Sequence, residues 1–197
     1  MIVYYRIMRT QDEEKKAALF EATVKLVNEI GFASSSVAKI AKIAGVSPST
    51  VYVYYENKQD LLVSTYVELK LRMVRAVLED FDDSLPLRDI MKRVWVNMFK
   101  YIADNREYNS YIEQFANSPY TSLVNIEELE KPFMPLQRIL QQGIQQKILK
   151  DVDSNFLVAF TFKPLAYLAN PHLCHGMEYS EEDIEKAFGM AWDALKL

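Results

Sequence analysis

Apolar residues recur at three- and four-residue steps along almost the whole chain, and this spacing constrains the fold more than any other feature. The first such face, from residue 13 onward, consists of Leu19, Ala22, Leu26, Val27 and Ile30. A helix of 3.6 residues per turn places residues at these steps on one side. No segment shows the alternation of a strand, and only five glycines and seven prolines interrupt 197 residues. The pattern therefore predicts an all-α fold.

Charge and composition narrow the possible partners. The net charge is −4, and residues 1–60 hold eight Lys and Arg against seven Asp and Glu. A nucleic acid would therefore have to bind through a small surface with precisely placed contacts rather than through a general positive field. No stretch reaches the roughly 20 apolar residues of a membrane span. A single cysteine, Cys174, cannot form a disulfide framework, so we expect a cytoplasmic protein with no membrane partner.

Residues 36–58 contain the most informative local pattern. Two short amphipathic segments, Ser36–Ala44 and Pro48–Tyr55, are separated by Gly45-Val46-Ser47. Ser36 and Ser47 are suited to cap the two helices, and proline is tolerated at the first helical position. Two short helices joined by a glycine-containing turn form a helix-turn-helix, whose second helix enters the DNA major groove in many proteins.

The same segment resembles the tetracycline-repressor (TetR) family. The resemblance is carried by Gly45-Val46-Ser47, Thr50-Val51-Tyr52, Tyr54-Tyr55, Asn57-Lys58 and Asp60-Leu61-Leu62. It covers residues 15–62, whereas residues 63–197 match the family only in length and helical pattern. Two departures are Ser49, where the family often has glycine or another small residue, and the absence of Arg or Lys from the second helix of the motif.

This resemblance implies a two-part organisation and a function. Residues 1–58 would form a three-helix DNA-binding domain, and residues 59–197 a helical bundle for ligand binding and dimerisation. The function implied is a DNA-binding transcription regulator, a repressor, released from its operator by a small molecule. The implied partners are palindromic operator DNA, a largely apolar effector and a second copy of the chain. No cofactor and no enzymatic activity are expected.

The resemblance also assigns roles to residues of the motif. It implies phosphate contacts for Ser36, Ser47, Tyr52, Tyr54 and Lys58, and base-edge contacts for Pro48, Ser49 and Thr50. Hydroxyl groups and helix N-termini commonly bind phosphates, and threonine can contact either type of base pair. The alternative is that the tyrosines are ordinary core or surface aromatics. For Tyr55 we expect core packing.

Aromatic and methionine side chains are dense in the second half, where the resemblance implies a ligand cavity. The candidate pocket residues are Trp95, Met98, Phe99, Tyr111, Phe115, Phe160 and His172. Stripes of this kind more often form core than ligand sites, and that alternative stays open. The polar residues Asn97, Glu113 and Gln114 could orient a ligand.

Two further helical patterns, residues 154–169 and 180–196, resemble the dimerisation helices of the family. The candidate interface residues are Phe156, Phe160, Ile184, Phe188, Ala191, Trp192 and Leu195. The alternative is that both apolar stripes face inward within one chain. We expect Ser180 to cap the last helix, with Asp183 at its third position.

A metal site is not expected. His172, Cys174 and His175 are too few for a closed zinc site without carboxylates or a second subunit. No glycine-rich phosphate loop or metallohydrolase motif is present. Two competing functions remain, an all-α enzyme and a helical interaction module, in both of which the helix-turn-helix is only architecture. Specific binding of duplex DNA, lost when a ligand is added, would separate the regulator from both.

Overall fold

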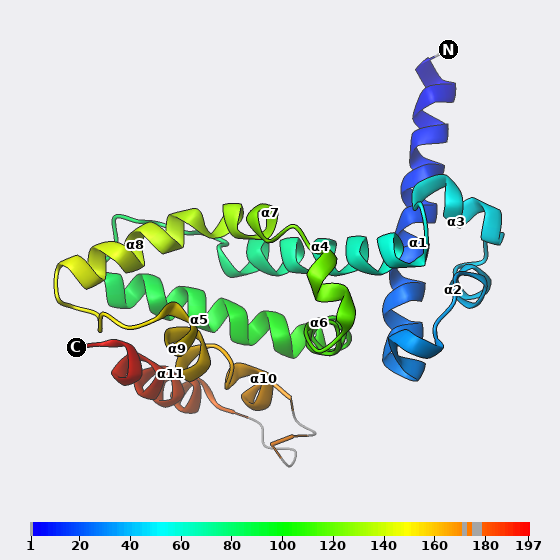
Figure 1. The fold of residues 1–197 in the computed structure, drawn as a ribbon. Helices are drawn as coiled ribbons and strands as arrows, with labels where there is room; N and C mark the ends of the chain where they lie inside the picture. The colour runs from blue at the N-terminus through cyan, green and yellow to red at the C-terminus, as the bar shows by residue number, and fades with distance from the viewer. Residues whose placement is uncertain (1, 171–172, 175–178) are drawn as a thin grey trace. The chain divides into compact units, whose positions relative to one another are not determined.

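The computed structural model describes residues 2–170, 173–174 and 179–197. Its helices are α1 (Ile2–Ser34), α2 (Val37–Ala44), α3 (Pro48–Tyr54), α4 (Lys58–Val77), α5 (Leu87–Asp104), α6 (Arg106–Ala116), η1 (Pro119–Leu123), α7 (Ile126–Glu130), η2 (Lys131–Phe133), α8 (Met134–Gln145), α9 (Ser154–Thr161), α10 (Leu165–Leu168) and α11 (Glu181–Leu195) (Figure 1). The described residues contain no strand, only an isolated bridge between Leu149 and Lys196. The predicted all-α fold is confirmed.

The helices form two compact units. The first contains the chain up to Leu69 together with Glu107–Val124, and the second contains Lys70–Arg106 together with Asn125–Leu197. Helix α6 therefore belongs to the same unit as the helix-turn-helix, although it lies far along the chain. The predicted division of the chain into a DNA-binding part, residues 1–58, and a ligand-binding part, residues 59–197, is a functional one and stays a prediction.

The first unit has a small core that holds the helix-turn-helix together. Its buried members are Leu19, Ala22, Leu26, Val37, Ile40, Ala41, Val51 and Leu61. They come from one face each of α1, α2, α3 and α4, as the apolar spacing predicts. Tyr55 packs against this core, and its burial raises the pKa of its hydroxyl. The predicted core position of Tyr55 is confirmed.

A second core in the same unit joins α1 and α4 to α6. It contains Phe20, Val24, Val27, Leu62, Leu69, Tyr111, Ile112 and Phe115. The Tyr111 hydroxyl donates a hydrogen bond of 2.9 Å to the carbonyl of Leu62. Since this tyrosine is buried, the bond satisfies a polar atom that would otherwise be costly to enclose. Helix α6 is thus fixed to α4 by packing and by a buried hydrogen bond.

The second unit has its core among α5, α9, α10 and α11. The apolar spacing predicts one helix over residues 154–169, but the structure divides it into α9 and α10. Pro164 explains the break, because proline lacks an N–H and disfavours helical geometry at the preceding residue. The Trp95 indole N–H donates a hydrogen bond of 2.9 Å to the carbonyl of Thr161, the last residue of α9. Packing thereby supplies a donor where the helix ends.

The last helix begins as its sequence predicts. The Ser180 side chain accepts from the backbone N–H of Asp183, and the Asp183 carboxylate accepts from the backbone N–H of Ser180. This reciprocal capping box satisfies two backbone donors at the start of α11. The predicted cap is confirmed.

Candidate nucleic-acid interface

Local chemistry fixes the first helix and the turn of the motif. Ser36 caps α2 by accepting a hydrogen bond of 3.3 Å from the backbone N–H of Lys39. Gly45 ends the helix with φ 70° and ψ 26°, in the left-handed region that glycine enters without steric cost. The next residue, Val46, donates 3.0 Å to the carbonyl of Ala41. The turn is therefore set by residues within it.

The second helix is started by a serine and a proline. Ser47 has extended geometry and accepts 3.2 Å from the backbone N–H of Thr50, and Pro48 occupies the first turn. Val51 is the buried residue of α3 and attaches it to the small core. Because one short side of α3 is buried, its other side chains remain available to a partner.

The exposed side of α3 presents hydroxyl and apolar groups. Pro48 and Ser49 are exposed, and Tyr52 and Val53 are 58% and 74% exposed. The Ser47 hydroxyl lies 2.7 Å from that of Ser49 and 2.9 Å from that of Thr50. These groups sit at the helix N-terminus, where a positive partial charge and free backbone N–H groups favour anions.

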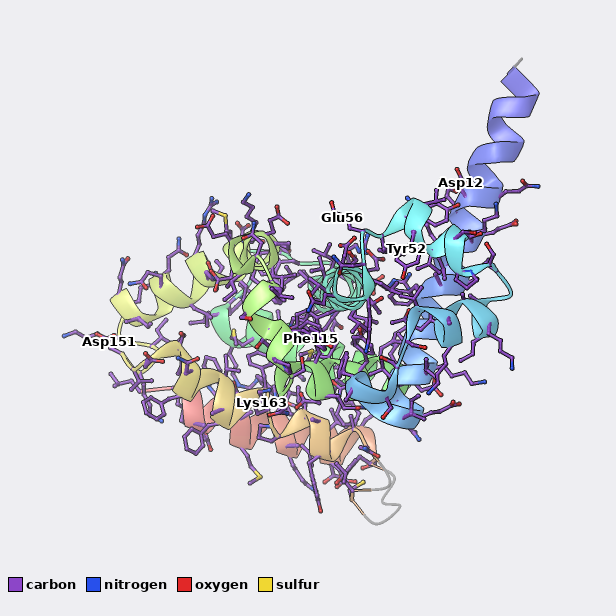
Figure 2. The ribbon with its side chains drawn as sticks, turned by 45° about the vertical axis from the view of Figure 1, so that its right-hand side comes forward. Asp12, Tyr52, Glu56, Phe115, Asp151 and Lys163 are labelled. Atoms are coloured by element: carbon purple, nitrogen blue, oxygen red, sulfur yellow. The ribbon has the colours of Figure 1, made fainter. Side chains whose placement is uncertain are left out.

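Tyr54 has a partner that the sequence did not indicate. Its hydroxyl donates a hydrogen bond of 2.8 Å to Oδ1 of Asp12 on α1, and the centroid of its ring lies 5.5 Å from Nζ of Lys16. Figure 2 shows Asp12 on α1 beside the helix that carries Tyr52. The hydrogen bond to Asp12, followed by burial, raises the pKa of the Tyr54 hydroxyl. The residue nevertheless stands at the edge of the exposed face.

Lys58 is also engaged within the first unit. Its ammonium donates a hydrogen bond of 2.8 Å to the carbonyl of Phe32, the residue that follows Gly31, whose φ is positive. The amine is half-buried, and this burial lowers its pKa. An ammonium group has three N–H donors, so two remain for another acceptor. The predicted phosphate contact of Lys58 is compatible with this bond and stays a prediction.

Two further contacts fix the start of α4 and the end of α1. Asn57 caps α4, because its side-chain oxygen accepts a hydrogen bond of 2.9 Å from the backbone N–H of Asp60. The ring of Phe32 packs edge-on against Tyr111 and Phe115, with centroids 5.2 and 5.7 Å apart. Phe32 thus contacts α6 through its side chain and Lys58 through its carbonyl.

The predicted pocket residues fall into separate places. Tyr111 and Phe115 are fully buried in the first unit. Trp95 and Phe99 line a small cavity of about 10 Å³ in the second unit, with Leu168, Tyr179, Asp183, Ile184 and Ala187. Met98 is half-buried against the same core, while Phe160 is exposed on α9. His172 lies outside the described residues.

The predicted dimer residues also divide. Phe188, Ala191 and Leu195 are buried in the core of the second unit, and Ile184 and Trp192 pack against it. The inward-facing alternative therefore describes this stripe of α11, because α5 and α9 of the same chain cover it. Phe156 and Phe160 differ, being 62% and 68% exposed. Helix α9 buries only Leu157 and Thr161.

Two other sequence expectations concern metals and membranes. Among the described residues, no group of three or more His, Cys, Asp and Glu side chains is placed to hold a metal ion. Both histidines lie outside that part of the chain. Within the same residues, no helix combines the length and apolar character needed to cross a membrane.

Comparisons with known proteins agree with the geometry. Residues 19–65 match the family described as bacterial regulatory proteins, tetR family, and residues 86–196 match a tetracyclin repressor-like C-terminal domain. The solved structure of a TetR family transcription regulator from Marinobacter aquaeolei VT8 is 35% identical, with a TM-score of 0.87 over 95% of this chain and 98% of that one.

Two further relatives carry more specific descriptions. A fatty acid metabolism regulator protein from Bacillus subtilis is 28% identical over 72% of this chain and 74% of its own length. The solved structure of the Bacillus subtilis transcriptional regulator FadR, in complex with stearoyl-CoA, is 21% identical. It has a TM-score of 0.61 over 90% of this chain and 95% of that one. At that identity the likeness concerns the fold.

Proposed function

Because the chain belongs to the TetR family of DNA-binding transcription regulators, we propose that α3 reads an operator and that an apolar small molecule in the second unit releases it. The observation that carries the DNA-reading part is the exposed side of α3. It combines a capped N-terminus, a cluster of hydroxyl groups and an exposed tyrosine. We also propose that the protein acts in the bacterial cytoplasm, where its operator DNA lies.

Base edges are read by the first residues of α3. Pro48, Ser49 and Thr50 lie at the end that enters the major groove in proteins of this architecture. The hydroxyls of Ser49 and Thr50 can each donate or accept, and the threonine methyl suits the methyl group of thymine. Without an arginine on this helix, each contact discriminates modestly, so specificity is shared among several base pairs.

Phosphates are held by a ring of residues around α3. These are Ser36, Ser47, Tyr52, Tyr54 and Lys58. Tyr52 is the most exposed of the three aromatic rings between residues 52 and 55, and Lys58 keeps two donors beyond its bond to Phe32. Such contacts fix the position of the protein on the duplex, and the one from Lys58 contributes to the salt dependence of binding because it neutralises a phosphate.

The effector is proposed to be a long fatty acyl compound. Support comes from the cavity beside Trp95 and Phe99, which is lined mainly by apolar groups, and from the relatives described above. The space in this cavity that a water-sized sphere can occupy is only about 10 Å³, room for about one water molecule. An acyl chain would therefore have to displace side chains such as Leu168, and this rearrangement would carry the signal.

The operator-bound form is proposed to be a homodimer. Helix α9 is rich in apolar residues yet exposes Phe156, Val158 and Phe160. Exposed apolar faces of this kind usually mark an interface. A two-fold dimer matches a palindromic operator, since each half-site meets one copy of α3.

A binding titration tests the proposal. A duplex is selected from a random library with the parent protein, and its affinity is measured by fluorescence anisotropy with and without stearoyl-CoA. We expect stearoyl-CoA to weaken DNA binding and coenzyme A alone to leave it unchanged. By reciprocity, the duplex should weaken stearoyl-CoA binding by the same factor.

A cavity-filling variant provides the matched control. Ala187 lines the cavity, so Ala187→Leu should bind DNA like the parent but lose the response to stearoyl-CoA, provided that its thermal unfolding is unchanged. Unchanged DNA affinity in the presence of stearoyl-CoA would refute the effector class. Failure to select any duplex would refute DNA reading itself.

A further inference from the structure

The hydrogen bond between Tyr54 and Asp12 restricts what Tyr54 can do on DNA. A tyrosine hydroxyl has one proton to donate, and here that proton is directed at Oδ1 of Asp12 at 2.8 Å. An ionised carboxylate only accepts hydrogen bonds, and so does a backbone phosphate. The hydroxyl of Tyr54 can therefore serve Asp12 or a phosphate, but not both at once.

Electrostatics adds to this competition. A phosphate oxygen bonded to the Tyr54 hydroxyl would lie about 2.7 Å from it, while Asp12 lies 2.8 Å from the same atom. If Asp12 stayed in place, its oxygen and the phosphate oxygen would be no more than about 5.5 Å apart. At this separation in water their repulsion corresponds to a roughly three-fold loss of affinity in each subunit. Lys16, 5.5 Å from the Tyr54 ring, offsets part of this repulsion.

The carboxylate of Asp12 lies next to α3, the helix that is proposed to contact DNA. Asp12 is exposed on α1, next to α3, and contacts a residue 42 positions away in the sequence. Figure 2 shows its side chain on the side of α1 that faces α3. A carboxylate at this place is not needed to fill the core, because the buried residues of the small core start at Leu19.

We propose that Asp12 limits the DNA affinity of this protein by occupying, on the Tyr54 hydroxyl, the position that a backbone phosphate takes in the complex. In the DNA-free protein the hydroxyl is held by the carboxylate. On binding, the hydroxyl proton is redirected to the phosphate and Asp12 is displaced towards solvent. The inference rests on the proposed DNA-reading role of α3.

Substitutions at Asp12 test the inference. Asp12→Asn keeps an oxygen that accepts the Tyr54 bond but removes the charge, whereas Asp12→Ala removes both. The control is Glu29→Gln, an equal charge change at an exposed residue of the same helix. It lies roughly 25 Å further along α1 at 1.5 Å per residue, well beyond the screening length at physiological salt.

Two probes are used, the duplex selected with the parent protein and a scrambled duplex of the same composition. We expect Asp12→Asn to tighten binding of both duplexes roughly three-fold per subunit, or about ten-fold for a dimer with two heads. Asp12→Ala should tighten it further, and Glu29→Gln should change it little. Equal or weaker binding by both Asp12 variants would overturn the proposal, as would an equal gain with Glu29→Gln.

A double-mutant cycle with Tyr54→Phe separates exchange from charge alone. If the hydroxyl must leave Asp12 to reach a phosphate, removing it should weaken DNA binding more in the Asp12→Ala background than in the parent. Additive effects would overturn the exchange. The parent's selective binding is measured in the same titrations, so its absence would count against DNA reading and not against Asp12 alone.

Discussion

The exposed face of α9 leads to the sharpest prediction about assembly. We expect the double substitution Phe156→Glu and Phe160→Glu to convert the proposed dimer into monomers that remain folded. The two rings are 62% and 68% exposed in the single chain. If a partner subunit covers them, charged residues at these positions would be enclosed without counter-charges.

The size of the effect follows from the exposed fractions. Complete burial of a phenylalanine is worth about 1.5–3 kcal/mol, so covering about two thirds of each ring contributes roughly 1–2 kcal/mol. A symmetric dimer contains four such rings, which gives roughly 4–8 kcal/mol. With 1.4 kcal/mol per factor of ten, their loss should weaken dimerisation by roughly 10³- to 10⁶-fold.

Sedimentation equilibrium over a range of protein concentrations measures this change. Ile126→Glu is the matched control, because Ile126 on α7 is also 62% exposed and lies outside the proposed interface. A second comparison is Phe188→Ala, which removes a ring buried in the core of the second unit. It should lower the unfolding temperature and leave the dimer intact. An unaltered dimer in the Phe156 and Phe160 double variant would refute the reasoning.

Four other predictions concern caps, titration and a buried bond. Ser47→Ala should cost about 0.5–2 kcal/mol of unfolding free energy in denaturant titrations and should also weaken duplex binding in anisotropy. Ser180→Ala should cost a similar amount of stability but leave duplex binding unchanged. The Ser180 hydrogen bonds lower the pKa of Asp183, so the stability that the ionised carboxylate contributes should be complete above the ordinary carboxyl pKa and lost as pH falls through the lowered pKa. In thermal melts recorded against pH, Asp183→Asn should reduce this loss of stability in acid. Trp95→Phe should lose about 1–3 kcal/mol, because the buried carbonyl of Thr161 loses its donor, and chemical denaturation would show it; unchanged stability would contradict that role.

Much of the helix-turn-helix could be predicted from the sequence, because its geometry is set locally. Ser36, Gly45 and Ser47 act on backbone groups within four residues of themselves. The contacts of Tyr54 and Lys58 could not be predicted in this way. They join residues 42 and 26 positions apart, and no short-range spacing encodes which polar groups meet across helices.

The second half was harder to predict for a related reason. An apolar stripe shows that one face of a helix is covered but not what covers it. In α11 the cover is the same chain, so Phe188 is buried. In α9 the aromatic residues remain exposed. Only the three-dimensional arrangement distinguishes the two cases, and the same ambiguity applies to Tyr111 and Trp95, which lie in different packing units.

A protein whose α3 reads a specific DNA sequence must prefer one duplex to another of the same composition. The dissociation constants of the parent protein for its selected duplex and for a scrambled duplex are measured by anisotropy in the same buffer at about 0.15 M salt. We expect the selected duplex to bind at least about 10³-fold more tightly than the scrambled one. Equal affinity for the two duplexes would refute sequence-specific reading by α3.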